Sequence, residues 1–92
     1  MSATGVWRPA PIVKTPPGGT FDLPLRNIMR ERFDLPVGDS YEEPGRVGGR
    51  LIESTESNRA WLQGLVDAGV EEADELLEAL RKHGRIEVWL VY

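Results

Sequence analysis

The sequence contains no cysteine, a single histidine and only two lysines among its 92 residues. The absence of cysteine excludes disulfides, thiolate nucleophiles and cysteine-ligated zinc sites. It is also compatible with a reducing compartment, and we expect a cytoplasmic protein. The lone histidine, His83, is the last residue of an expected helix. A helix C-terminus stabilises positive charge, so we interpret His83 as a structural residue.

Long apolar runs are also missing. No stretch approaches the roughly 18 apolar residues that a membrane span requires, and residues 1–8 lack the apolar segment of a secretory signal. The sequence has no Gly-x-Ser-x-Gly elbow and no EF-hand pattern. We therefore expect no membrane partner, no catalytic or metal-binding residues, no cofactor and no enzymatic activity.

Negative charge dominates, but it is unevenly distributed. Residues 1–36 carry five basic and three acidic groups, whereas residues 37–92 carry six basic and twelve acidic groups. An acidic chain is a poor ligand for nucleic acid, because neutralisation of phosphates supplies most non-specific affinity. Arginine outnumbers lysine nine to two. This ratio is typical of GC-rich genomes, and it suggests an actinobacterial-type host or one of its phages.

A chain of this length accommodates one domain. Residues 1–20 contain four prolines and the pair Gly18-Gly19. Proline removes hydrogen-bond donors from a strand ladder, so this stretch predicts an extended Pro/Gly-rich arm. We expect residues 21–92 to form a single α+β domain. In that domain three helices pack on a short β-sheet that includes the C-terminal strand.

Apolar periodicity predicts helices over residues 22–33, 56–68 and 70–83. Asp22 is a candidate cap for the first helix, and Gly69 and Gly84 are expected to follow the ends of the other two. Alternating apolar residues then predict a strand over residues 85–92, paired with residues 47–53 or with part of the arm. The expected core comprises Leu25, Ile28, Met29, Phe33, Trp61, Leu65, Leu76, Leu77, Leu80, Ile86, Val88 and Leu90.

Acidic side chains crowd the start of the third helix. A solvated face, a weak divalent-cation site and a docking surface for a basic protein partner are alternative interpretations. Trp89 is either an interface anchor or part of the core. The candidate partner-binding residues are Glu71, Glu72, Asp74, Glu75, Glu78 and Trp89.

Residues 60–70 and the helix after them resemble the helix–turn–helix step of DNA-binding domains. In such domains the start of the second helix contacts the bases and phosphates. Here those positions hold carboxylates, which DNA repels. We expect no direct nucleic-acid binding through helix 70–83.

These observations predict a non-enzymatic protein–protein interaction domain. One form of this hypothesis is a phage-type or actinobacterial accessory protein that binds and modulates a host protein. A structural protein that forms a homo-oligomer through its C-terminal strand is an alternative. An acidic helix-turn-helix-like regulator, or a DNA mimic, is another.

Overall fold

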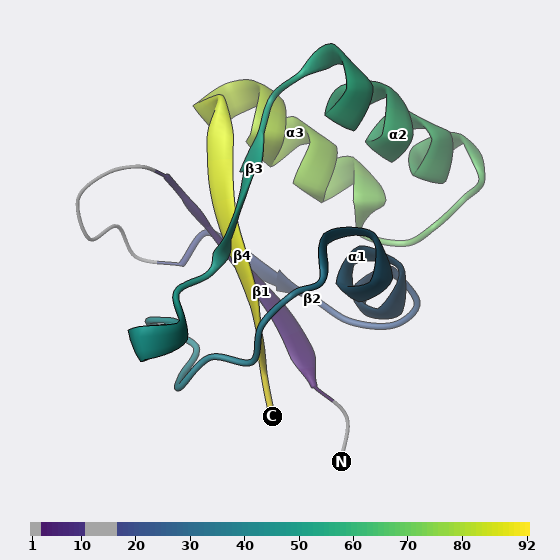
Figure 1. Ribbon diagram of the computed structural model, residues 1–92. Helices are drawn as coiled ribbons and strands as arrows, with labels where there is room; N and C mark the ends of the chain where they lie inside the picture. Colours follow the sequence, from purple (N-terminus) through teal and green to yellow (C-terminus); the bar gives the residue numbers. More distant parts are fainter. Residues whose placement is uncertain (1–2, 11–16) are drawn as a thin grey trace.

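The computed structural model describes residues 3–10 and 17–92 and forms one antiparallel sheet with helices on one face. The strands are β1 (Thr4–Pro9), β2 (Gly19–Phe21), β3 (Arg50–Glu53) and β4 (Arg85–Val91), in the order β2-β1-β4-β3. The helices are α1 (Leu25–Phe33), α2 (Glu56–Asp67) and α3 (Ala73–His83), with a short 3-10 turn, η1, at Gly45–Val47. The expected α+β class, with the C-terminal strand in the sheet, is confirmed (Figure 1).

The extended N-terminal arm is not confirmed. Thr4–Pro9 forms β1, which lies between β2 and β4 in the sheet, and Gly19–Phe21 forms β2. The strand accommodates a proline because Pro9 is its last residue. The missing N–H of proline at a strand end does not interrupt the hydrogen bonds between strands. The rest of the predicted arm, residues 1–2 and 11–16, lies outside the described residues.

The three helices were predicted with small errors at their ends. The second helix begins as expected after Thr55, whose side-chain oxygen accepts a hydrogen bond from the Asn58 N–H at 3.1 Å. It ends in a Schellman motif around Gly69, in which the N–H of Val70 donates to the Leu65 carbonyl. The first and third helices begin three residues later than predicted. The predicted Asp22 cap is wrong, because the N-cap residue of α1 is Pro24.

The C-terminal strand lies in the interior of the sheet. β4 pairs with β1 along one side and with β3 along the other, so both alternatives expected for its pairing occur together. Beyond β3, Val37 continues the ladder through a parallel bridge to Leu90. Among the described residues, β4 therefore has hydrogen-bonded partners along both of its sides. The free edges belong to β2 and β3.

The main core lies between the sheet and the helices. Eight of the twelve predicted core residues are buried, and Phe33, Trp61 and Leu65 pack partly buried against the same cluster. The twelfth, Ile28, is half-buried. The main cluster also includes seven residues outside that expected core list: Ala3, Phe21, Leu35, Ile52, Leu62, Ala73 and Ala79.

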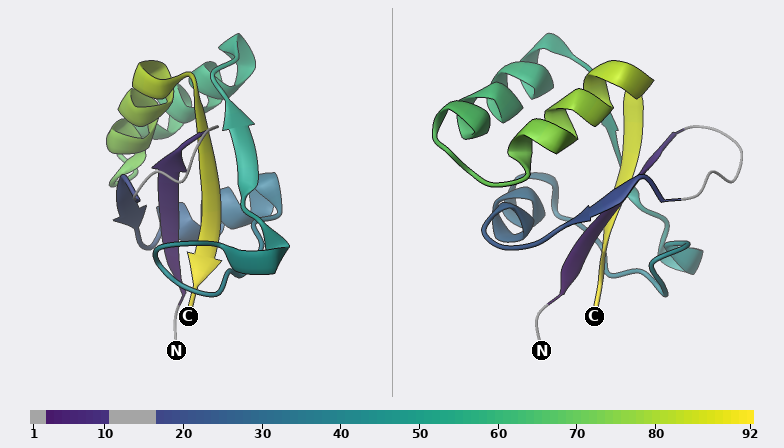
Figure 2. Two further views of the ribbon diagram at one scale, coloured as in Figure 1. Left: turned by 90° about the vertical axis from the view of Figure 1, so that its left-hand side faces the viewer. Right: turned by 180° about the vertical axis from the view of Figure 1, so that it is seen from behind.

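The opposite face of the sheet has a small core of its own. Val6, Trp89 and Val91 form a buried cluster there. The segment of residues 37–48 crosses this face, while the helices lie on the far side of the sheet (Figure 2, left). The indole N–H of Trp89 donates to the Ser40 carbonyl at 2.8 Å, which anchors the segment.

An ion pair joins the strands on this second face. The Arg8 Nε lies 2.7 Å from a Glu87 carboxylate oxygen, and the other oxygen accepts from the Gly49 N–H at 2.8 Å. The Arg8 guanidinium also lies 5.4 Å from the ring centre of Trp89. Both charged side chains are mostly buried, so their mutual hydrogen bonding offsets much of their desolvation.

Candidate interaction surface

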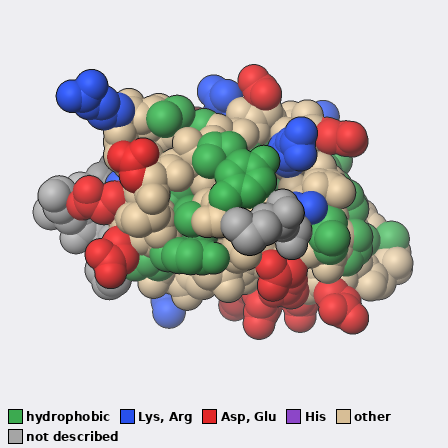
Figure 3. Space-filling model, turned by 90° about the horizontal axis from the view of Figure 1, so that it is seen from below, with side chains coloured by type: hydrophobic (Ala, Val, Ile, Leu, Met, Phe, Trp, Pro, Cys, Tyr) green, Lys and Arg blue, Asp and Glu red, His purple; other side chains and the backbone are tan. Residues whose placement is uncertain are grey.

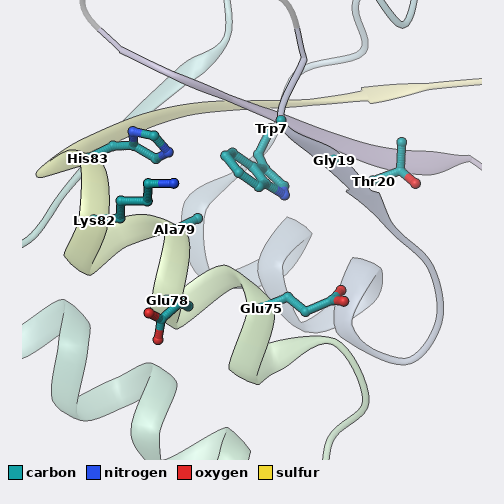
Figure 4. Close-up of a pocket in the computed structure, with 9 residues that line it drawn as sticks. Trp7, Gly19, Thr20, Glu75, Glu78, Ala79, Lys82 and His83 are labelled. Carbon is teal, nitrogen blue, oxygen red and sulfur yellow. The ribbon is translucent and has the colours of Figure 1, made fainter.

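A cleft of about 400 Å³ lies between α3 and the β1–β2 edge of the sheet. One wall is the backbone of residues 18–20, and Trp7 projects into the cleft from β1 (Figure 4). The other wall is α3, which contributes Glu75, Glu78, Ala79, Lys82 and His83. The volume is within the range of about 300–1,000 Å³ typical of ligand-binding pockets.

Trp7 has this position because β1 pairs with β4. Trp7 lies opposite Val88, a core residue, so its side chain is on the helix face of the sheet. The indole is partly buried against the main core, and its ring centre lies 6.1 Å from that of His83. The remaining exposed part of the indole lines the cleft.

Two glycines allow the indole to lie against the β2 edge. A Cβ atom on Gly18 would come within 2.2 Å of the Trp7 ring, and one on Gly19 within 2.9 Å of its Nε1. Both distances are shorter than any van der Waals contact. The pair Gly18-Gly19 is therefore a packing requirement of Trp7 as well as part of the cleft wall.

The charges along α3 are ordered from acidic to basic. Glu75 lies in the first turn of the helix, Glu78 lies at its middle, and Lys82 and His83 lie at its end. Lys82 lies seven positions after Glu75, a rise of about 10 Å along a helix. In Figure 4 the carboxylate of Glu75 extends along the cleft beneath β2, whereas Lys82 and His83 lie at the opposite end of the indole.

The predicted acidic residues have different environments. Glu75 and Glu78 line the cleft, whereas Glu71 and Asp74 are exposed outside it. Glu72 is half-buried, and its carboxylate accepts a hydrogen bond from the backbone N–H of Asp22 at 2.8 Å. Glu72 therefore fastens the start of α3 to the end of β2. Acidic side chains also gather along the lower margin of the surface in Figure 3.

Trp89 belongs to the core. Its side chain is fully buried on the second face of the sheet, and its indole N–H is bonded to Ser40. Of the two alternatives for this residue, the structure shows the core, so Trp89 is unavailable as an interface anchor. Trp7, four residues from the start of the described chain, lines a surface cleft instead.

Trp7, Gly18 and Gly19 are not among the partner-binding residues expected from the sequence. The apolar pair Val6-Trp7 showed that this stretch could pack on another surface, but it did not indicate a strand. The nearby prolines favoured an arm instead. Only the pairing of β1 with β4 brings Trp7 against α3.

Within residues 3–10 and 17–92, no group of three His, Cys, Asp or Glu side chains is arranged to hold a metal ion. None of the helices described is long and apolar enough to cross a membrane. No protein-family model, curated protein or solved structure significantly matches this chain.

Proposed function

We propose that this protein is a non-enzymatic interaction domain that binds a protein partner through the cleft between β2 and α3. One observation carries the proposal: an indole and two carboxylates, from Trp7, Glu75 and Glu78, line the same surface cleft. Tryptophan is enriched among the residues that dominate binding energy at protein interfaces. Its position at the surface, only partly buried by the domain's own core, supports an interaction role.

The charge of the cleft favours a basic partner. Its two carboxylates outnumber the single ammonium group of Lys82. A lysine or arginine side chain of the partner gains both ionic attraction to Glu75 and cation–π attraction to the Trp7 face. Glu71 and Asp74 extend the negative field beyond the cleft and steer the approach of a positively charged surface.

Reversing the charge of the cleft tests this proposal. We expect the double variant Glu75→Lys and Glu78→Lys to lose partners that the wild-type protein retains from a lysate of its native organism, identified by mass spectrometry. The matched control, Glu31→Lys with Glu42→Lys, changes the net charge equally at exposed positions on α1 and on segment 37–48. It should keep those partners. Equal retention by both variants would contradict the proposed surface.

A further inference from the structure

The edge of β2 beside the cleft has a free backbone position. The Ala10 N–H donates to the Arg85 carbonyl at 3.0 Å. This bond identifies which residues of β1 direct their backbone N–H and C=O groups toward β4. Hydrogen-bonded positions alternate along an antiparallel strand, so Val6 faces β4, whereas Gly5 and Trp7 face β2. The Trp7 carbonyl indeed accepts from the Gly18 N–H at 2.9 Å.

The same alternation determines the direction of the β2 backbone groups. Gly19 and Phe21 lie opposite Trp7 and Gly5, so their backbone groups face β1. Thr20, between them, directs its N–H and C=O away from the sheet. Thr20 is exposed, and no hydrogen bond to a described residue occupies these two groups. They are a donor and an acceptor at an open sheet edge.

The next outward donor on this edge already has a strand-like partner. The Asp22 N–H is bonded to the carboxylate of Glu72, at the start of α3. A side-chain oxygen thus takes the place that a neighbouring strand's carbonyl would have. Two residues earlier, at Thr20, the outward N–H and C=O groups have no hydrogen-bond partner among the described residues. The cleft lies between this edge and α3.

We infer that the partner binds as an extended segment that adds a strand to the β2 edge. Hydrogen bonds to the Thr20 N–H and C=O supply the backbone pairing, as in other strand-addition complexes. Alternate side chains of the added strand then enter the cleft over Trp7 and Ala79. A lysine or arginine of the added strand, at the position nearest Glu75, supplies the opposite charge to that carboxylate. This inference rests on the proposed function and specifies how its partner binds.

A proline substitution tests the contribution of the Thr20 backbone N–H to binding separately from that of the Thr20 side chain. Thr20→Pro removes the outward N–H but no β1–β2 hydrogen bond, and edge strands accept proline where the N–H faces solvent. Thr20→Val changes the side chain and keeps the N–H. Circular dichroism and urea unfolding establish that each variant is folded before binding is measured.

The probe is a randomised library of ten-residue peptides, selected on the wild-type protein. We expect the selected peptides to contain Lys or Arg flanked by β-branched residues and to shift the Thr20 amide resonance in NMR titrations. Thr20→Pro should weaken their binding about tenfold or more, the effect of losing a backbone hydrogen bond and adding a steric clash. Thr20→Val should bind within about twofold of wild type. N-methylation of the peptide residue opposite Thr20 should weaken binding as Thr20→Pro does.

The outcomes distinguish this inference from the proposed function. If Glu75→Lys with Glu78→Lys abolishes binding while Thr20→Pro does not, the cleft binds a partner but strand addition is wrong. If neither variant weakens binding, both proposals are wrong. Failure to select peptides that shift Thr20, or pairing of this edge with a second copy of the chain in sedimentation experiments, also overturns the strand-addition inference.

Discussion

Two tryptophans on neighbouring strands have opposite roles because strand side chains alternate between faces. In the pairing of β1 with β4, Val6 lies opposite Trp89 and Trp7 lies opposite Val88. The two tryptophans are therefore offset by one residue, and their side chains are on opposite faces of the sheet. Trp89 therefore points to the second face, where it is fully buried and bonded to Ser40 in segment 37–48. Trp7 points to the helix face and remains accessible at the cleft.

At the residue scale, Gly18→Ala should displace the indole of Trp7. The added Cβ meets the ring at 2.2 Å, and the ring is held by the core beneath it. Overpacking of this kind costs about 1–3 kcal/mol of unfolding free energy. Urea unfolding measures the cost, and the Trp7 indole N–H resonance reports the displacement.

Gly64→Ala is the matched control for this substitution. Gly64 lies within α2, and a Cβ there has no neighbouring atom within 4 Å. The same chemical change should therefore stabilise the protein by about 0.5–1 kcal/mol, because alanine loses less backbone entropy in a helix. A Gly18→Ala protein as stable as wild type, with an unmoved indole resonance, would refute the close packing of Trp7 on the β2 edge.

At the element scale, α2 and α3 form a hairpin, and α3 gives the cleft its outer wall. The two helices lie side by side with opposite chain directions (Figures 1 and 2). The buried side of α3 includes Leu76, Leu77 and Leu80, which leaves Glu75 and Glu78 on the outside. The orientation of the acidic side chains thus depends on the leucine stripe of the same helix.

The N-cap of α2 offers a test of how firmly this hairpin is held. Thr55→Ala removes the acceptor for the Asn58 N–H and should lower the unfolding free energy by about 1 kcal/mol. Thr55→Ser keeps a hydroxyl at the same position and should stay close to wild type. Urea unfolding followed by circular dichroism measures both, and equal stability of the alanine and wild-type proteins would argue against the cap.

At the scale of the whole molecule, the sheet depends on contacts between the two ends of the chain. β1 pairs with β4 over residues separated by most of the sequence, from Thr4 opposite Val91 to Pro9 opposite Ile86. β2 pairs with β1 alone, so it has no place in the sheet without β1. The Arg8–Glu87 ion pair and the cluster of Val6 with Trp89 also require β1.

Deletion of residues 1–9 should therefore abolish cooperative unfolding, because it removes an interior strand and both of these contacts. An arm lying outside the domain would be lost with little effect. Deletion of Tyr92, which follows β4 and is 64% exposed, is the matched control at the other terminus. Thermal unfolding by calorimetry distinguishes the cases, and a sharp transition in the protein without residues 1–9 would show that β1 is dispensable.

The local sequence determined the helices and the surface positions of most of the candidate acidic residues. The leucine spacing of residues 73–80 suffices to orient α3, because helical periodicity alone decides which side chains face the core. Glu75 and Glu78 were therefore identifiable as surface residues from the sequence. Gly69 and Gly84 likewise marked helix ends, because both have the positive φ that glycine adopts readily.

Only the tertiary structure decided that the proline-rich beginning of the chain belongs to the sheet. The hydrogen bonds and apolar contacts that stabilise β1 come from β4, about 80 residues away in the chain. No local sequence pattern predicts contacts between segments so far apart. The same pairing places Trp7 beside α3, buries Trp89 and leaves Thr20 at an open edge. The acidic helix was thus determined by its own sequence, whereas the cleft beside it was determined by strand pairing between distant segments.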